Sequence, residues 1–389
     1  MVSSSDQLLL CKSILADLVA FDTTSHLSNL ELIQYITSYL GEYEIKTQTI
    51  LNETGNKANL IATIGPNVSG GVVLSGHTDV VPVVGQNWST DPFSVVEAEG
   101  KLFGRGTSDM KGFIAATLAA VPTFIKANLK RPIHIALSYD EEVGCLGVQQ
   151  MLQPIKEFVA QPRLVIVGEP TSMQVGNAHK GQMVSKTCIW GREAHSSRPD
   201  DGVNAVEIAA ELIGVLGKLR DTARETGAKD NEFDPPYTSF NIGPISGGSA
   251  FNIIPNQCEF DWEFRFVPSD DADAIIGTYN AYINDVLNPR LEAKFPGCRA
   301  ENEVWAILPP LKAEKGSDAE TLALALAERN DTTVLAFGTE AGHFQSIDFP
   351  TVVCGPGDIA QAHKPDEYIE VSQLEACGKL MRRLTEVLA

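Results

Sequence analysis

Four short apolar runs, each bounded by glycine or proline, constrain the fold of this chain more than any other feature. They cover residues 72–76, 133–139, 164–168 and 351–355. Short runs of this kind, rich in β-branched residues, are typical of fully buried strands in a parallel sheet. A histidine or a carboxylate follows each run within a few residues. The ligand crevice of such a sheet lies beyond the carboxyl ends of its strands, so we expect these polar side chains to gather there.

Segments with helical periodicity alternate with these runs. Leucine and isoleucine recur at three- and four-residue spacing in residues 6–20 and 28–40, and further helices are predicted at 110–127, 147–158 and 371–388. Alternation of strands and helices with these lengths predicts an α/β fold with a doubly wound, mostly parallel sheet.

The middle of the chain has a different pattern. Residues 258–266 alternate strictly between apolar and charged side chains, which is typical of a half-exposed antiparallel strand. Strands at 183–190 and 237–242 and helices at 203–225 and 270–287 complete this block. We therefore predict a small α+β domain of ferredoxin-like type at 181–293. It is inserted into a larger catalytic domain formed by residues 1–180 and 294–389.

Bulk composition excludes several classes of protein. A chain of 389 residues is expected to form two domains, and 43% hydrophobic with 7% aromatic residues is ordinary for a soluble protein. No apolar stretch is long enough to span a bilayer, and the first residues lack the features of a secretory signal, so we expect a cytoplasmic protein without a membrane partner. The seven cysteines are scattered and include no C-x-x-C pair, which predicts neither a disulfide framework nor a thiolate zinc site.

The chain is strongly acidic, with a formal net charge of −20. Nucleic acid is therefore not expected as a partner, because binding it requires a basic surface. The charge would help to attract a small cationic substrate, although it would equally serve solubility.

The polar residues beyond the apolar runs form the donor set of a metal site without cysteine. They are His77, Asp79, Glu141, Glu142, Glu169 and His363. Imidazole and carboxylate groups that converge in this way are the ligands of a catalytic zinc or a similar divalent ion.

Two of these motifs, and a further candidate ligand at Asp109, have a second interpretation. Asp79 lies two residues after His77 and could orient an imidazole, or both could belong to a surface turn. Asp109 precedes a helix, where it could cap the helix or bridge two metal ions, and these roles are compatible. Adjacent carboxylates at 141–142 point in opposite directions on an extended segment, which suggests one ligand and one proton acceptor, although glutamate pairs are also common on surfaces.

Six ordered motifs carry a resemblance that runs from about residue 70 to the C-terminus. They are H-T-D at 77–79, G-R-G-x-x-D-M-K-G at 104–112, the glutamates at 141–142, G-E-P-T at 168–171, A-H-S-S at 194–197 and Q-A-H-x-P-D-E-Y at 361–368. Together they resemble the M20 family of metallo-hydrolases. The resemblance implies two divalent metal ions, zinc foremost, with cobalt able to substitute.

The resemblance also implies individual roles. Asp109 would bridge the two ions, with His77 and Glu169 completing one site and Glu142 and His363 completing the other. Asp79 would orient His77, and Glu141 would be the general base. A glutamate at 169 is more similar to the deacylases of the family than to its aminopeptidases.

Further roles implied by the resemblance fall mostly in the inserted domain, which would serve as lid and dimerisation domain. His195 would reach the active site of the other subunit of a homodimer and stabilise the oxyanion, although its sequence context is also that of a polar turn. Asn252 and Arg265 would contact the carboxylate of the substrate, and an ordinary surface charge is the alternative for Arg265. Glu340, in the larger domain, would meet the substrate's ammonium group.

Within the family, four segments most resemble the members that deacetylate N2-acetylornithine in arginine biosynthesis. They are residues 168–172, 178–181, 202–205 and 338–341. The expected reaction is attack by a metal-bridged hydroxide, with Glu141 as base, to give ornithine and acetate. The alternatives are a deacylase of another N-acyl amino acid, such as succinyl-diaminopimelate, and an inactive homologue that binds metal or amino acid. The intact Glu141 argues against inactivity, since binding alone needs no base.

Overall fold

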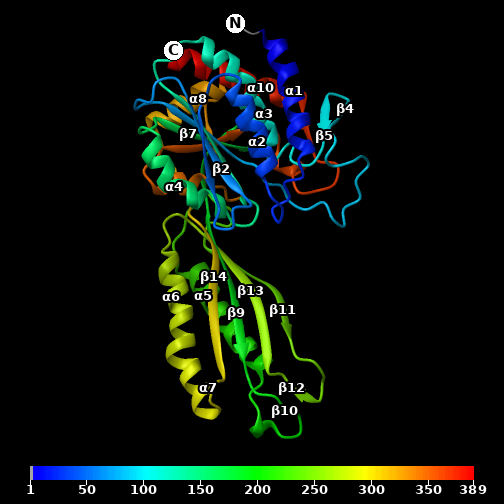
Figure 1. Ribbon diagram of the computed structural model, residues 1–389. Coiled ribbons are helices and arrows are strands. Elements are labelled where there is room, and N and C mark those ends of the chain that lie inside the picture. The colour runs from blue at the N-terminus through cyan, green and yellow to red at the C-terminus, as the bar shows by residue number, and fades with distance from the viewer. Residues whose placement is uncertain (1–2) are drawn as a thin grey trace. The chain divides into compact units, whose positions relative to one another are not determined.

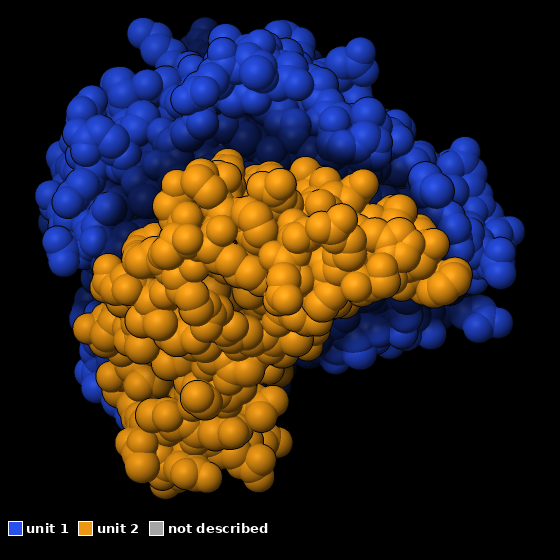
Figure 2. Space-filling view, turned by 90° about the horizontal axis from the view of Figure 1, so that it is seen from below, with its two compact units in different colours: residues 1–178, 311–335, 339–389 blue, residues 179–310, 336–338 orange. Residues whose placement is uncertain are grey.

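The structure, a computed structural model that describes residues 3–389, consists of two compact units. The first unit runs to Ala178 and resumes at Leu311–Leu335 and Thr339–Ala389. The second unit comprises His179–Pro310 and Ala336–Gly338. Figure 2 colours the two units separately.

An eight-stranded mixed sheet forms the centre of the first unit, in the order β1-β2-β6-β3-β7-β16-β8-β15 (Figure 1). These strands are β1 Thr47–Leu51, β2 Ala58–Ile64, β3 Val72–His77, β6 Ile133–Ser138, β7 Leu164–Pro170, β8 Val175–His179, β15 Thr332–Leu335 and β16 Thr351–Gly355. The four central strands β6, β3, β7 and β16 are parallel to one another, whereas β2 and β8 join them antiparallel. The predicted α/β class with a mostly parallel sheet is confirmed, and the four apolar runs are its four central strands.

Helices cover both faces of this sheet. The first unit contains α1 Ser4–Ala20, α2 Leu30–Gly41, α3 Lys111–Lys126, α4 Leu146–Phe158, α8 Asp318–Ala327, α9 Ala341–Ser346, the short 3₁₀ helix η3 Ile359–Gln361 and α10 Val371–Leu388. Helices α1, α2, α3, α8 and α10 share one hydrophobic core with the strands, and α4 and α9 pack together elsewhere on the sheet. Helix α3 is buried along nearly its whole length because small alanine side chains let it approach the sheet closely.

A separate three-stranded sheet pairs β4 Val96–Ala98, β5 Lys101–Phe103 and β17 Tyr368–Glu370. Strands β5 and β17 are antiparallel, and Phe103 lies opposite Tyr368. The pairing therefore joins segments that are more than 250 residues apart in sequence, and it places the residue after β5 near the residue before β17.

The second unit has a four-stranded antiparallel sheet in the order β11-β13-β9-β14. Its elements are β9 Gly181–Trp190, β10 Ala194–His195, η1 Pro199–Asp201, α5 Ala205–Glu225, β11 Ser239–Gly247, β12 Ile253–Ile254, β13 Gln257–Phe266, α6 Ala272–Ala281, the π-helix η2 Tyr282–Leu287, α7 Asn288–Lys294 and β14 Arg299–Leu308. The side chains predicted to be apolar on 258–266 are buried in the core of this unit, next to α5 and α6. The β-α-β-β-α-β connectivity and strand order are those of a ferredoxin-like unit.

The end of this unit differs from the predicted boundary at residue 293. Strand β14 pairs along its length with β9 and completes the sheet, so the second unit continues to Pro310. The register shifts between Val304 and Ala306, and the Trp305 side chain remains 47% exposed. That irregularity interrupts the period of two in the sequence, which is why the strand was not predicted.

All seven cysteines are free, as the sequence predicts. Within residues 3–389, no helix combines the length and the apolar character needed to cross a bilayer.

Candidate active site

The parallel strands bring the predicted residues to one edge of the central sheet. Strand β3 ends at His77, β6 ends three residues before Glu141, and Glu169 is the last residue but one of β7. Asp79, Asp109 and Glu169 are at most 5% exposed. Carboxylates and imidazoles so far apart in sequence become neighbours because parallel strands all end at the same edge.

The carboxylate of Asp109 lies between two imidazoles. Its Oδ1 is 2.9 Å from Nε2 of His77, and its Oδ2 is 3.1 Å from Nε2 of His363. Burial alone would raise the pKa of Asp109, but hydrogen bonds from His363 and His77 lower it overall. Helix α3 begins two residues later without a side-chain cap, so Asp109 faces the imidazoles rather than the helix. One oxygen toward each imidazole is the arrangement of a carboxylate that bridges two cations.

The ring of His77 is oriented by the backbone of Asp79. Nδ1 of His77 lies 2.9 Å from the Asp79 carbonyl oxygen and 3.6 Å from Oδ1 of the same residue. A carbonyl oxygen only accepts, so Nδ1 donates and the lone pair of a neutral ring is left on Nε2. The nitrogen that faces Asp109 is therefore the one available to a metal ion.

The Asp79 carboxylate has a second task that the sequence did not indicate. Its oxygens accept the backbone N–H groups of Glu141 and Glu142 at 3.0 and 3.3 Å. The hydroxyl of Ser25 donates to Asp79 Oδ2 at 2.8 Å. One buried carboxylate thus fixes the backbone of both glutamates next to the ring of His77. Burial alone would raise the pKa of Asp79, but its interaction with His77, followed by the bonds from Ser25 and Glu141, lowers it overall.

The two adjacent glutamates have different partners. Glu142 Oε2 lies 3.0 Å from Nε2 of His363, whereas Glu141 Oε1 accepts a weak bond from the Cys145 thiol at 3.4 Å. Burial raises the pKa of Glu141 to about 8 and that of Glu142 to about 7, with nearby carboxylates adding to the effect. The segment is not an extended strand: Asp140 has a φ of 54°, Glu142 lies in a turn, and each carboxylate has an oxygen within 4.8 Å of a ring nitrogen of His77.

Glu169 is the clearest sign that the cluster is built for cations. Its Oε1 is buried and has no hydrogen-bond partner among the residues that the structure describes, and it lies 3.9 Å from Nε2 of His77. Burial, and next the charge of Asp109, raise the pKa of Glu169. Donor atoms of His77, Glu141 and Glu169, and likewise of His77, Asp109 and Glu142, lie within 4.8 Å of one another. Divalent cations fit this set, because they take imidazole nitrogens and carboxylate oxygens and offset buried negative charge.

His363 reaches the cluster from a loop between η3 and β17. Its backbone has a φ of 63°, in the left-handed region that non-glycine residues adopt rarely, and its side chain is 52% exposed. Hydrogen bonds to Asp109 and Glu142 raise the pKa of its imidazole to about 10. The surrounding contacts must hold this conformation, since it is unfavourable by itself.

Glu340 lies against strands β3 and β6. It is 1% exposed, and its two oxygens accept the hydroxyls of Ser75 and Ser138 at 2.6 and 2.7 Å. Burial raises its pKa, and the serine bonds oppose that rise.

The remaining predicted residues lie in the second unit. His195 of β10 pairs with Ile253 of β12, and the carbonyl of Asn252 accepts the N–H of Ser196 at 3.0 Å. His195 and Asn252 are thus brought together. Arg265 lies on β13, where its Nε donates to Glu263 at 3.4 Å and its side chain is 41% exposed.

Comparison with known proteins shows which family the chain belongs to. The profile of Peptidase family M20/M25/M40 matches residues 73–387, about four fifths of the chain. The chain belongs to peptidase family M20/M25/M40. Two curated relatives are 35% identical and are both named acetylornithine deacetylase. The one from Shigella sonnei aligns over 91% of this chain and 90% of its own, and the one from Photorhabdus laumondii over 98% and 95%. The chain is therefore an M20-family hydrolase that acts on amide C–N bonds, as predicted.

Solved M20-type structures share the fold. A metallo-carboxypeptidase of the M20 family from Sulfolobus solfataricus superposes with a TM-score of 0.75 at 16% identity, covering 97% of this chain and 99% of its own. An aminopeptidase from Bacillus cereus gives a TM-score of 0.72 at 21% identity, covering 98% of each chain. A Bacillus subtilis protein described as a dinuclear metal-binding peptidase of the M20 family gives a TM-score of 0.65 at 16% identity, covering 99% of each chain.

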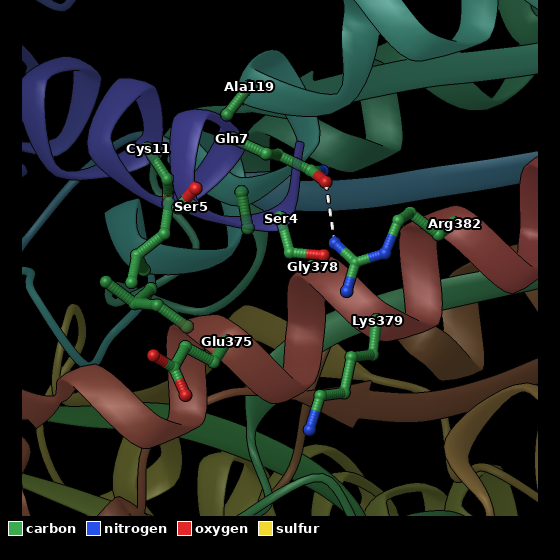
Figure 3. A pocket seen from close by; sticks show the side chains of 12 residues that line it. Ser4, Ser5, Gln7, Cys11, Ala119, Glu375, Gly378, Lys379 and Arg382 are labelled. Atoms are coloured by element: carbon green, nitrogen blue, oxygen red, sulfur yellow. Dashed lines mark hydrogen bonds between the residues drawn. The ribbon is translucent and has the colours of Figure 1, made fainter. Parts of the chain in front are cut away.

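A pocket in the first unit does not include the acidic cluster, the name used here for His77, Asp79, Asp109, Glu141, Glu142, Glu169 and His363. It has a volume of about 320 Å³ and is lined by residues of α1, α3 and α10 (Figure 3). Inside it, Arg382 donates to Oε1 of Gln7 at 2.8 Å. No residue of the acidic cluster lines this pocket, so it is not part of the candidate active site.

Proposed function

We propose that this M20-family hydrolase removes the acetyl group from N2-acetylornithine and releases acetate and ornithine. The chemistry rests on one observation, the Asp109 carboxylate that presents one oxygen to each of two imidazoles. The choice of substrate rests on the curated relatives, whose length and motifs the chain shares. Each alignment covers at least 90% of this chain and at least 90% of the relative, which supports a shared domain organisation.

Two divalent cations, zinc foremost and cobalt as a substitute, would be held by five residues. His77, Asp109 and Glu169 would bind one, and Asp109, Glu142 and His363 would bind the other. When bound, the cations supply the Lewis acidity that makes water a nucleophile near neutral pH and polarises the amide carbonyl. The unpartnered Oε1 of Glu169 and the buried negative charge support this assignment.

Glu141 would be the general base. Its side chain carries a raised pKa, and its backbone is fixed by Asp79. In the reaction a carboxylate oxygen of Glu141 accepts a proton from the attacking water and then delivers it to the nitrogen of the departing amine. The amide C–N bond breaks, the acyl carbon keeps the water oxygen, and ornithine leaves as the amine.

His195 would donate to the oxyanion of the tetrahedral intermediate. The backbone N–H of Ser197 donates to Nδ1 of His195 at 3.2 Å, so Nδ1 is the acceptor and a neutral ring carries its proton on Nε2. That leaves a ring N–H available as an oxyanion donor. We propose that the second unit acts as lid and dimerisation domain and that His195 serves the partner subunit's site in a homodimer.

The ends of the substrate would meet three further side chains. Asn252 and Arg265 would bind its carboxylate, since a guanidinium meets a carboxylate with two parallel hydrogen bonds. Glu340 would interact with the ammonium group of the ornithine side chain, held in orientation by Ser75 and Ser138.

A substrate panel tests this function. Metal-depleted protein would be reloaded with zinc or cobalt and assayed against N2-acetylornithine, succinyl-diaminopimelate and N-acetylmethionine. We expect kcat/KM to be highest for N2-acetylornithine with either metal. A preference for the succinylated substrate or for N-acetylmethionine would assign the chain to another deacylase class, and no turnover of any substrate would refute the catalytic proposal.

A further inference from the structure

A buried ion pair adjoins the acidic cluster at the backbone of Asp109. Arg105 Nη1 donates to Oε2 of Glu367 at 2.6 Å, and both side chains are 1% exposed. Removing two charges from water is unfavourable, and a buried pair of this kind is often no more stabilising than apolar residues of the same size. Neither residue is a proposed metal ligand. Since stability is a weak reason for burying these two charges, we looked for their role in the hydrogen bonds that they make.

Glu367 holds the backbone at Asp109. Its Oε1 accepts the N–H groups of Ser108 at 2.9 Å and of Asp109 at 3.1 Å. Its own backbone carbonyl accepts the N–H of Gly104 at 2.9 Å, next to the pairing of β5 with β17. The position of Asp109 is thereby tied to the segment that follows His363.

Arg105 holds the loop of His363. Its Nη2 donates to Gln86 Oε1 at 2.6 Å, and Gln86 Nε2 donates in turn to the carbonyl oxygen of His363 at 3.0 Å. The guanidinium also lies 5.0 Å from the ring centre of Trp88, and the indole N–H of Trp88 donates to Gln86 at 3.1 Å. These contacts meet the left-handed residue of the loop, where the backbone needs support.

We propose that Arg105 and Glu367 are positioning residues that set the spacing of Asp109 and His363, and so form the metal site that these two share with Glu142. This inference rests on the ligand assignment of the proposed function. Only a planar guanidinium meets Glu367 and Gln86 at once, because its donors form a rigid fork.

The consequence is selective for one of the two sites. His77 and Glu169 lie on β3 and β7, whose hydrogen bonds within the sheet hold them without help from Arg105. His363, in contrast, lies on a loop, where the Nε2 of Gln86 donates to its carbonyl oxygen and its ring contacts Asp109 and Glu142. Removing residues that orient metal ligands typically weakens binding by about 10- to 100-fold. The site of His77 and Glu169 depends on Arg105 only through the shared Asp109. We therefore expect the cation at Glu142 and His363 to be weakened by that factor and the other to be weakened much less.

The test is calorimetric titration of metal-depleted protein with zinc, with visible absorption of the cobalt-loaded protein as a second readout. The variants are Arg105→Met and Gln86→Ala, the latter in a partly exposed loop position that leaves the buried pair intact. The matched control is Arg163→Met, which removes an exposed pair with Asp318 in the same unit. The wild type should bind two equivalents, and the control should match it. Arg105→Met should retain one tight equivalent, lower the affinity of the other by about 10- to 100-fold, and change the cobalt spectrum.

Two further comparisons separate positioning from general stability. Because Arg105 serves the site that His363 completes, Arg105→Met should add little to the loss already caused there by His363→Ala, as expected for residues that act as one unit. Equal weakening of both equivalents, or unchanged affinities, would overturn the inference. If Arg105→Met does not fold, Gln86→Ala decides alone: about tenfold weaker binding of one equivalent supports the inference, and wild-type affinity refutes it. A wild type that binds fewer than two equivalents would instead remove the proposed function itself.

Discussion

Replacement of Glu141 by glutamine should separate metal binding from catalysis. The amide has nearly the same shape as the carboxylate but cannot accept a proton from water. The backbone N–H of Glu141 bonds to Asp79 at 3.0 Å and does not depend on the side chain, so the loop at 141–142 should remain in place. A positioned general base typically contributes about 10²- to 10⁴-fold to the rate. At 1.36 kcal/mol for each factor of ten, the transition state should lose about 3 to 5 kcal/mol.

The assay measures kcat and kcat/KM for N2-acetylornithine together with the zinc content of the same preparation. We expect two zinc ions per chain in Glu141→Gln, as in the wild type, and a fall of about 10²- to 10⁴-fold in kcat. Glu157→Gln, the same change at an exposed position on α4, serves as the control and should leave both quantities unchanged. Turnover of Glu141→Gln within tenfold of the wild type, with metal retained, would show that Glu141 is not the base.

Three other predictions concern pH, specificity and packing. The carboxyl groups at residues 141–142 have pKa values raised by burial to about 8 and about 7, so the folded metal-free protein binds more protons than the unfolded chain across pH 6 to 8. The free energy of unfolding should therefore fall as pH rises through this window, and zinc should reverse the loss; urea melts in chelator that show rising stability would contradict this. Glu340→Gln should raise KM for N2-acetylornithine much more than it raises KM for N-acetylmethionine, which lacks the ammonium group, and an equal effect on both would exclude Glu340 from recognition. Gly168→Ala should destabilise the protein by about 1 to 3 kcal/mol, because the new Cβ would lie 2.0 Å from the ring of Phe113. Gly41→Ala, with nothing within 4 Å of its Cβ, is the control in the same urea titration.

The sequence predicted the part of the site that the central sheet builds. His77 and Glu169 lie at the ends of apolar runs that form β3 and β7, and the general rule for parallel sheets brings them together. The pair at 141–142 follows β6 for the same reason. These predictions needed only local patterns and one rule of topology.

The rule placed His363 beyond β16, but it could not place Asp109 or show that the two residues meet. Both lie in loops, and the pairing that brings their segments together involves β5 and β17, which have three residues each. Strands so short have no recognisable period, so only the resemblance to the M20 family connected them. The roles of Arg105 and Glu367 depend on the same pairing and were equally hidden, although both lie within the motifs.

Sequence patterns also failed at the edges of the sheets. Strand β1 is a half-exposed edge strand without a continuous apolar run, and it was not predicted. In β14 a register shift displaces the alternation, and the predicted domain boundary fell before this strand. Edge strands and bulges are set by their tertiary partners more than by their own residues.

The most direct test of the account is the number and position of metal ions in crystals of the zinc-loaded protein, measured by anomalous scattering at the zinc edge. Two peaks are expected, one between His77 and Glu169 and the other between Glu142 and His363, with the Asp109 carboxylate shared by both. A single peak that is not in contact with Asp109, or no peak at these side chains, would contradict the account.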